Sequence, residues 1–287
     1  MISGAAGRRR PAALRLFRRR WPHPVYWWAA ILALVLLGAA LGPELWTTDP
    51  NRTNLLNRFA GPSFEHPLGT DGYGRDLLAR LLRGARLSLV SAAIVIVCST
   101  LLGLVVGSLA AVVGGIIDTL AARLVDGLLA LPALVVALGL IGVFGTGWTT
   151  LVFALTATGW PWYARIYRSL VIAERQKPYV TAARAIGAGT LRIAVRHLGP
   201  NIAGPVAVVA ATDLGATILG LAAFSFLGLG VAPPTPEWGA MVAEGRQHFQ
   251  SHPWVIVAPG LAITVTVIVV NLFSDALRGA ADPIGRR

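Results

Sequence analysis

Six long apolar segments, almost free of charged side chains, set the strongest constraint on what this chain can fold into. A helix needs about 20 mainly apolar residues to cross the hydrocarbon core of a bilayer. The segments that meet this requirement are Trp27–Trp46, Leu87–Val113, Thr119–Phe144, Trp148–Ala173, Ile202–Val231 and Trp254–Asp275. Their residues do not alternate between apolar and polar as they would in a transmembrane β-strand. The sequence therefore predicts an all-α membrane protein with six transmembrane helices.

The composition indicates that lipid surrounds much of the protein surface. Only 13% of the 287 residues are charged, against about a quarter in soluble domains. The net charge of +12 raises nucleic acid as a second partner. However, the basic residues flank the apolar segments and do not gather on one face, so we expect no nucleic-acid binding. The lone cysteine, Cys98, excludes an internal disulfide, and no cleavable signal peptide is evident.

The distribution of Lys and Arg predicts the orientation of the spans. Of the 25 basic residues, eighteen fall in connecting segments on one side of the membrane and seven on the other. The positive-inside rule places the richer side in the cytoplasm. The basic tail 1–26 and the tail 276–287 are therefore both expected in the cytoplasm, as an even number of spans also requires.

The segment 47–86 is expected to lie outside the lipid on the outward side. Its last part leads into the second span with four leucines spaced for one apolar helical face and three arginines, Arg80 among them, on the other. This pattern predicts an interfacial helix before the second span.

The largest polar interruption between spans is the cytoplasmic segment 174–201. Pro178 is suited to the first turn of a helix, and Gly187 is expected to break or bend that helix. Pro200 is expected to end the structure that follows before the fifth span begins. Arg184 lies off the apolar face of the predicted helix, which consists of Tyr179, Ala182, Ala183 and Ile186. The residues alone leave two interpretations open, a docking element for another protein and a plain interfacial helix that caps the bundle.

This segment resembles the cytoplasmic coupling motif of permeases from bacterial ATP-binding-cassette (ABC) importers. Ala182, Ala183, Gly187 and Pro200 match the motif, whereas Thr181 stands where glutamate is usual. A second departure is Gly199, which stands where leucine is usual.

Four further blocks resemble the second permease of the dipeptide, oligopeptide and nickel importers, and they follow in the same order and spacing. They are 66–89 (HPLGTDGYGRDLLARLLRGARLSL), 123–132 (RLVDGLLALP), 225–246 (SFLGLGVAPPTPEWGAMVAEGR) and 271–283 (NLFSDALRGAADP). The resemblance implies an ABC type I importer permease fold, with a five-helix core over 87–275, in the plasma (inner) membrane of a bacterium.

The resemblance also implies partners and a cargo. The chain would pair with a sister permease as a heterodimer, and two cytoplasmic ATPase subunits would dock on the coupling segment and bind ATP and Mg²⁺. An extracellular or periplasmic binding protein would deliver peptides, or alternatively nickel or another small solute. The coupling residues implied are Thr181, Ala182, Ala183, Arg184, Gly187 and Pro200.

The chain itself lacks the residues of a nucleotide site or an enzyme. Its only lysine, Lys177, is followed by Pro178, so no phosphate-binding Gly-Lys-Ser/Thr loop exists. The five histidines have no metal-ligand spacing, and no nucleophile–base pair is recognisable. We therefore expect no catalytic residue, no metal and no cofactor in this chain. A gradient-driven carrier and a membrane enzyme remain the alternative classes.

Two carboxylates inside predicted spans are candidates for the transport pathway, because intramembrane acids are costly and commonly functional. Asp126 has Arg123 one turn before it, which makes local pairing the alternative interpretation. Asp213 has no basic residue within one helical turn and is expected to face the pathway or the sister subunit.

The outward loop 231–253 contains a run of prolines that stiffens it. Pro234, Glu237 and Trp238 of this loop are candidates for docking the binding protein, and an interfacial plug is the alternative role.

Overall fold

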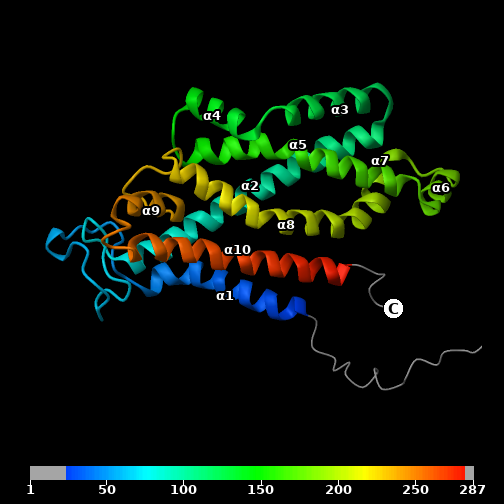
Figure 1. Ribbon diagram of the computed structural model, residues 1–287. Helices are drawn as coiled ribbons and strands as arrows, with labels where there is room; N and C mark the ends of the chain where they lie inside the picture. The colour runs from blue at the N-terminus through cyan, green and yellow to red at the C-terminus, as the bar shows by residue number, and fades with distance from the viewer. Residues whose placement is uncertain (1–23, 282–287) are drawn as a thin grey trace, which may run out of the picture.

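The computed structural model describes residues 24–281, and these residues are mainly helical. The predicted tail 1–26 lies almost wholly outside the described residues, as does the end of the tail 276–287. Strand-like pairing within 24–281 is limited to one isolated bridge between Thr70 and Asp76. The long helices that run lengthwise through the molecule (Figure 1) are α1 (Pro24–Leu45), α2 (Leu77–Val113), α5 (Trp148–Arg175), α8 (Gly199–Phe226) and α10 (Trp254–Ala281). The all-α prediction is confirmed.

Shorter elements gather at the two ends of this bundle. The loop 46–76 lies at one end with the 3-10 turns η2 (Leu55–Asn57) and η4 (Arg246–His248) and with α9 (Trp238–Gly245). The elements at the other end are α6 (Pro178–Ala185), α7 (Thr190–Ile193) and the π-helical turn η3 (Ala194–Leu198). The first residues of α1 and the last residues of α10 point toward this second end (Figure 1).

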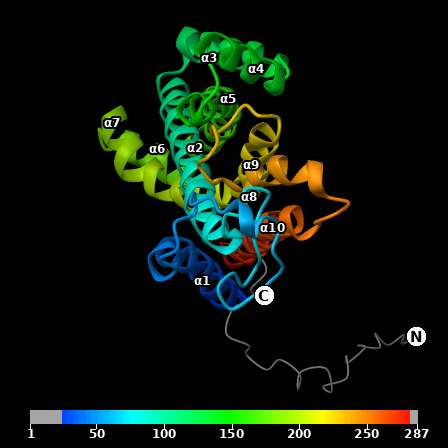
Figure 2. The same ribbon diagram turned by 90° about the vertical axis from the view of Figure 1, so that its left-hand side faces the viewer.

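Two helices, α3 (Gly115–Ala130) and α4 (Ala133–Phe144), lie along α5 on the side away from α1 and α10 (Figure 2). They replace the single straight span predicted over 119–144, because their axes differ by 86°. The break falls at Leu131, whose backbone is extended (φ −85°, ψ 136°). Since a residue that precedes proline disfavours the helical region, Pro132 gives a local cause for this break.

The apolar helices are long enough for a membrane protein. Four helical segments within the described residues can cross a bilayer by length and hydropathy, and the bent pair of α3 and α4 makes a fifth. These four are 25–45, 77–113, 190–226 and 254–280. Helix α5 falls outside this set, and its sequence carries threonines, tyrosines and arginines among its apolar residues. Large apolar side chains remain exposed on α1 to α4, as expected for a surface that meets lipid or another subunit.

Small residues bring α2 and α5 together along their length. A Cβ atom placed on Gly103 would collide with Tyr163, and one placed on Gly107 would collide with the backbone of Ala164. Ser99 lies four residues before Gly103, and a Cβ atom placed on Gly159 would come within 3.1 Å of its Oγ. This spacing of small residues lets two helix backbones approach closely, which is the usual basis of helix association in lipid.

The predicted interfacial helix before the second span is wrong. Helix α2 continues without a break from Leu77 to Val113, so the residues expected to lie flat form its first three turns. Leu77 is 1% exposed and so is Arg80, which the helical pattern placed on the polar face. Both side chains are buried because the loop 46–76 and α9 pack around this end of α2.

The predicted stop at Pro200 is also wrong, because helical structure runs without a gap from Thr190 to Phe226. Proline removes one backbone donor, and its ring clashes with the carbonyl four residues earlier, at Arg196. The π-helical turn Ala194–Leu198 lies at this point and widens the helix around it. The fifth predicted span ends earlier than expected, at Phe226, where Gly228 has φ +80° and terminates the helix.

Candidate functional site

The coupling segment 174–201 folds into a short helix, a tight turn and a second helical stretch. Lys177 precedes Pro178 in an extended conformation, and Pro178 occupies the first turn of α6 as predicted. At the other end of α6 the amide of Ala188 donates to the carbonyl of Ala183 (3.0 Å) and the amide of Gly187 donates to that of Arg184 (2.9 Å). This pair of bonds is a Schellman motif, which places Gly187 at φ +84°. The prediction that Gly187 breaks the helix is confirmed.

The inner face of α6 differs from the predicted apolar face. Val180 is fully buried and Ala183 is 6% exposed, whereas Ala182 and Ile186 point outward. Val180 and Ala183 belong to a cluster with Ala111 of α2, Val171 of α5 and the residues Ile193, Leu198 and Ile202. Ala183 therefore anchors the segment to the bundle and is not available to a partner protein.

The outer face of the segment is apolar and basic. Ile186 is 87% exposed, Leu191 78% and Val195 68%. Thr181, Ala182 and Arg184 are exposed as well, and so is Pro200. A cavity of about 590 Å³ opens on this face, and it is lined by Gly187, Gly189, Leu191, Arg192, Val195 and Arg196. The segment thus presents a hollow lined by apolar side chains and two arginines.

Polar contacts tie the segment to the end of α5. The Tyr179 hydroxyl donates to Glu174 Oε1 (2.7 Å), and Lys177 Nζ lies 2.7 Å from Glu174 Oε2. Asn201 donates to the Tyr179 oxygen (3.3 Å) and to the carbonyl of His197 (2.6 Å). Burial and the hydrogen bond to Glu174 raise the pKa of Tyr179 to about 12. These contacts attach α6 to the end of α5.

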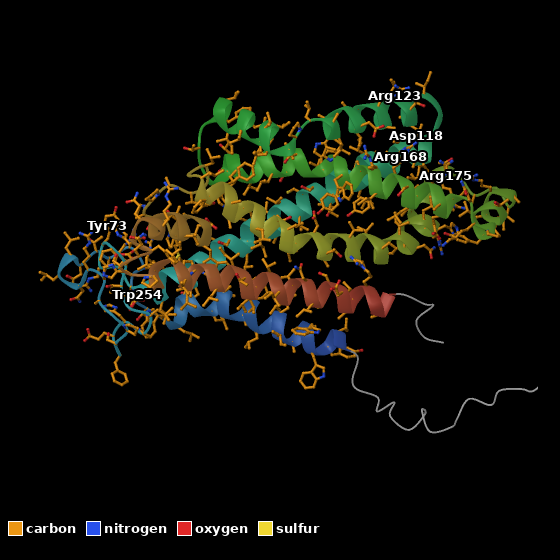
Figure 3. All side chains as sticks on the ribbon, in the orientation of Figure 1. Tyr73, Asp118, Arg123, Arg168, Arg175 and Trp254 are labelled. Atoms are coloured by element: carbon orange, nitrogen blue, oxygen red, sulfur yellow. The ribbon has the colours of Figure 1, made fainter. Side chains whose placement is uncertain are left out.

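The first pathway candidate, Asp126, lies at an exposed position on α3. Its carboxylate contacts Arg165 of α5 at 2.6 Å, so its partner comes from another helix and not from Arg123 as the sequence pattern suggested. A neighbouring pair of Asp118 and Arg168 is bidentate, with distances of 2.6 and 2.7 Å (Figure 3). These two pairs fasten α3 to α5 at the end of the molecule that carries the coupling segment.

The second pathway candidate, Asp213, lies close to the midpoint of α8 and accepts a hydrogen bond from the Tyr163 hydroxyl of α5. Both residues line a cavity of about 220 Å³ between α2, α4, α5 and α8. Ser99, Thr158 and Thr217 supply hydroxyl groups to the same cavity. A carboxylate at mid-helix beside a cavity is the arrangement expected of a residue on a transport pathway.

Two of the three docking candidates in the outward loop are buried. Glu237 is 4% exposed and caps α9 by accepting from the amides of Gly239 (3.1 Å) and Ala240 (3.0 Å). Its carboxylate also accepts from Ser88 Oγ (2.8 Å), and Trp238, 4% exposed, donates Nε1 to the carbonyl of Leu81 (3.0 Å). Both side chains therefore hold α9 on α2, and only Pro234 is left on the surface for a partner.

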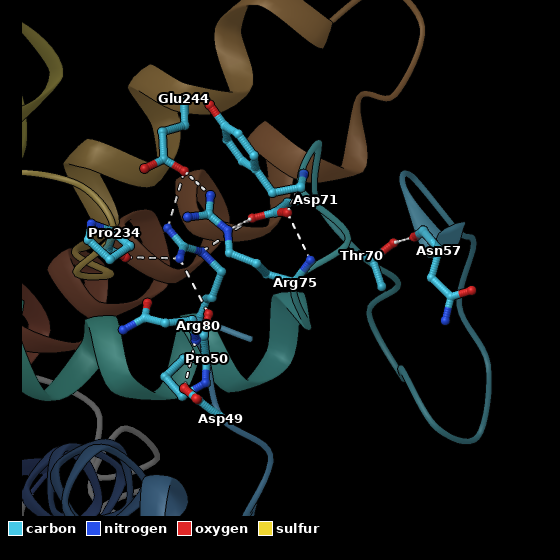
Figure 4. Close-up of polar contacts among 11 residues, drawn as sticks. Asp49, Pro50, Asn57, Thr70, Asp71, Arg75, Arg80, Pro234 and Glu244 are labelled. Carbon is cyan, nitrogen blue, oxygen red and sulfur yellow. Dashed lines mark hydrogen bonds and ion pairs between the residues drawn. The ribbon is translucent and has the colours of Figure 1, made fainter. Parts of the chain in front are cut away.

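A buried ionic cluster that lies at this end of the bundle was not predicted from the sequence. Arg75 contacts Asp71 and Glu244, each at 2.6 Å, and Arg80 lies 3.2 Å from Glu244 (Figure 4). Arg80 also donates to the carbonyl of Pro234 (3.1 Å). The cluster contains two acids and two arginines and is therefore neutral. The alternation of acidic and basic residues in the block 66–89 could have indicated an ionic cluster. Its partner Glu244, however, lies far away in the sequence.

A bundle of apolar helices with a protruding segment at one end and a cavity with a carboxylate at mid-length has the parts of a membrane transport subunit. Residues 103–284 match the family of the binding-protein-dependent transport system inner membrane component. The chain belongs to this family, the permeases of ABC importers.

Individual relatives cover most of the chain. The nickel transport system permease protein NikC of Escherichia coli (strain K12) is 39% identical over 89% of this chain and 94% of its own length. The di/tripeptide transport system permease protein DppC of Pseudomonas aeruginosa (strain UCBPP-PA14) is 44% identical over 88% and 85%, respectively. These relatives are permease subunits, not enzymes.

The fold is similar to that of a solved transporter. A chain from inward-facing structures of the MetNI methionine ABC transporter has a TM-score of 0.58, with 19% identity over 71% of this chain and 97% of that chain. At this level of identity the likeness concerns the fold.

Proposed function

We propose that this permease forms half of a peptide pathway across the plasma membrane of a bacterium and couples it to two ATPase subunits. A sister permease would supply the other half as a heterodimer, and a binding protein would deliver the cargo. ATP and Mg²⁺ would be held by the ATPases. The relatives named for di/tripeptides and for nickel leave nickel import as the second candidate.

The observation that carries this proposal is the division of the coupling segment into two faces. The inner face is anchored to the bundle through Val180 and Ala183. The outer face exposes Ile186 and Leu191 around a cavity of about 590 Å³. An exposed apolar surface that includes two arginines is suited to a protein partner, because burial of its side chains yields most of the binding energy. Rigid attachment to α5 lets movement of that partner reach the spans.

We further propose six spans: α1, α2, the bent pair of α3 and α4, α5, α8 and α10. Helix α5 packs against α2, α3 and α4, and its tyrosines Tyr163 and Tyr167 are buried within the protein. With six crossings, both termini share the side of the coupling segment. That side also carries Arg123, Arg168 and Arg175 (Figure 3), in agreement with the excess of basic residues expected in the cytoplasm.

Docking of the ATPases can be tested with a substitution on the exposed face. Leu191→Asp should abolish co-purification of the ATPase subunits and leave the melting temperature of the permease unchanged. Leu56→Asp is a matched control, because Leu56 is 96% exposed at the opposite end of the molecule. Normal yields of ATPase with Leu191→Asp would refute the assignment.

Orientation can be tested through the single cysteine. Cys98→Ser removes the native thiol, after which Leu191→Cys and Leu56→Cys each introduce one accessible thiol. A membrane-impermeant maleimide should label position 56 in intact cells or spheroplasts, and position 191 only after the membrane is opened. Labelling of position 191 from outside would invalidate the proposed topology.

A further inference from the structure

The cavity beside Asp213 places a carboxylate far from both ends of the helix bundle. Asp213 and Tyr163 both lie near the middle of 28-residue helices. Such helices are about 42 Å long, so their midpoints fall near the centre of the bilayer. A carboxylate at this depth is costly unless a cation or hydrogen-bond donors compensate it.

No ion pair formed by residues 24–281 includes Asp213. The guanidinium of Arg278 donates instead to Thr212 Oγ1 (3.0 Å), the residue before it. Tyr163 supplies a single hydrogen bond, to Oδ2 of the carboxylate. The negative charge of Asp213 is therefore only partly compensated within the chain.

The threonine and tyrosine hydroxyl groups around Asp213 have already used their hydrogens. Thr158 donates to the carbonyl of Ala154 (3.0 Å), and Thr217 donates to the carbonyl of Asp213 (3.0 Å). The Tyr163 hydrogen points to the carboxylate itself. A hydroxyl that donates in this way offers a bound molecule only its oxygen lone pairs. The cavity of about 220 Å³ thus presents hydrogen-bond acceptors and one negative charge.

We propose that this cavity recognises a positively charged amino group on the cargo as it passes through the permease. An ammonium group carries three donors and no acceptor, which complements a carboxylate surrounded by acceptor oxygens. This inference rests on the proposed function, since it requires that α5 and α8 line the pathway. It narrows the cargo to molecules that bear an ammonium group, as peptides with a free amino terminus do.

A transition-metal cation fits the same cavity less well. Nickel is bound best by imidazole and thiolate ligands, whereas carboxylate and hydroxyl oxygens suit harder ions. Within the described residues there is no group of three or more His, Cys, Asp or Glu side chains that could hold a metal ion. The acceptors at Asp213 therefore favour an ammonium group over a bare metal ion.

The test uses the assembled transporter in proteoliposomes, with its ATPases, sister permease and binding protein. The probes are dialanine, N-acetyl-dialanine and N-acetyl-alanyl-lysine, whose only ammonium group is on the side chain. Asp213→Asn keeps an acceptor for Tyr163 and removes the charge. Asp275→Asn, at an exposed carboxylate on α10, is the matched control. Basal ATPase activity and melting temperature verify assembly of each variant.

We expect wild-type uptake to favour dialanine over N-acetyl-dialanine, and Asp213→Asn to lower dialanine uptake about tenfold, equivalent to ~1.4 kcal/mol. The Asp275→Asn variant should retain the wild-type preference. Loss of N-acetyl-alanyl-lysine uptake in Asp213→Asn would extend recognition to side-chain ammonium groups, and its retention would restrict recognition to the amino terminus.

Three results overturn the inference. They are an unchanged dialanine preference in Asp213→Asn, equal wild-type uptake of dialanine and N-acetyl-dialanine, and no wild-type uptake of either peptide. Uptake that requires no ATP contradicts the proposed function instead, so the two failures are distinguishable.

Discussion

Arg80 and Glu244 lie 164 positions apart in the sequence, and the guanidinium Nη2 of the first is 3.2 Å from the carboxylate Oε2 of the second. Their contact joins the first turn of α2 to the end of α9. Arg80 is 1% exposed, and its remaining donors reach Asp71 and the carbonyl of Pro234. The end of the bundle that carries the loop 46–76 is therefore held together by a buried ionic cluster and not by apolar packing alone.

Removal of one partner from this cluster should strongly destabilise the protein. Arg80→Ala leaves Asp71 and Glu244 with one guanidinium between them, and an uncompensated buried charge costs about 3–5 kcal/mol. We expect a lower melting temperature in detergent. Arg83→Ala is the control, since Arg83 lies on the exposed side of the same helix. Equal melting temperatures for the two variants would contradict a structural role for the cluster.

The burial of Arg80 could not be predicted from the sequence around it. Helical periodicity predicted a helix here but placed Arg80 on its polar face, because the element that covers that face, α9, follows much later in the chain. For Asp126 the sequence offered Arg123 as the alternative to a pathway role, whereas the structure supplies Arg165 from α5 as its partner. The break between α3 and α4 had a readable cause in Pro132, and the local signals at Pro178 and Gly187 were interpreted correctly. Local chemistry was predictable, and long-range partners were not.

The turn after α6 should tolerate only glycine at low cost. Gly187 has φ +84°, and a Cβ atom at this position would meet no neighbour within 4 Å. Gly187→Ala should therefore destabilise the coupling segment through backbone strain alone, by about 1–2 kcal/mol. Hydrogen exchange of the amides of α6 should report this change. Gly189→Ala is the control, because Gly189 has φ −68° and the same open surroundings.

Ala183 and Ala182 should respond differently to enlargement. Ala183 is buried against Val171 and Ile193, so Ala183→Trp should loosen the coupling segment from α5 before any partner is present. Ala182 is exposed, so Ala182→Trp should leave the permease intact and weaken ATPase binding. Limited proteolysis of the permease alone separates the two effects. Faster cleavage in both variants would mean that Ala182 also supports the fold.

The contact between α2 and α5 should depend on the small size of the residue at position 107. Gly107→Leu places a side chain against the backbone of Ala164, which cannot move aside without shifting α5. We expect loss of folded protein, with overpacking costs of at least ~1–3 kcal/mol. Gly139→Leu on α4 is the control, because open space surrounds that position. Detergent-solubilised yield and monodispersity measure the difference, and similar yields would show that the two helices can separate.

The coupling segment should loosen at high pH because of Tyr179. Its pKa is raised to about 12 by burial and by the hydrogen bond to Glu174, compared with about 10 in an unfolded chain. The folded state thus holds the proton more tightly, so this contribution is complete below pH 10 and is lost as the pH rises from 10 through 12. Proteolysis of the segment by an alkaline protease at pH 9 and pH 11 offers a direct comparison. The Tyr179→Phe variant should be cleaved faster than the wild-type protein at pH 9. Its cleavage rate should increase less than that of the wild-type protein between pH 9 and pH 11. An equal increase in both proteins would assign the loosening to another group.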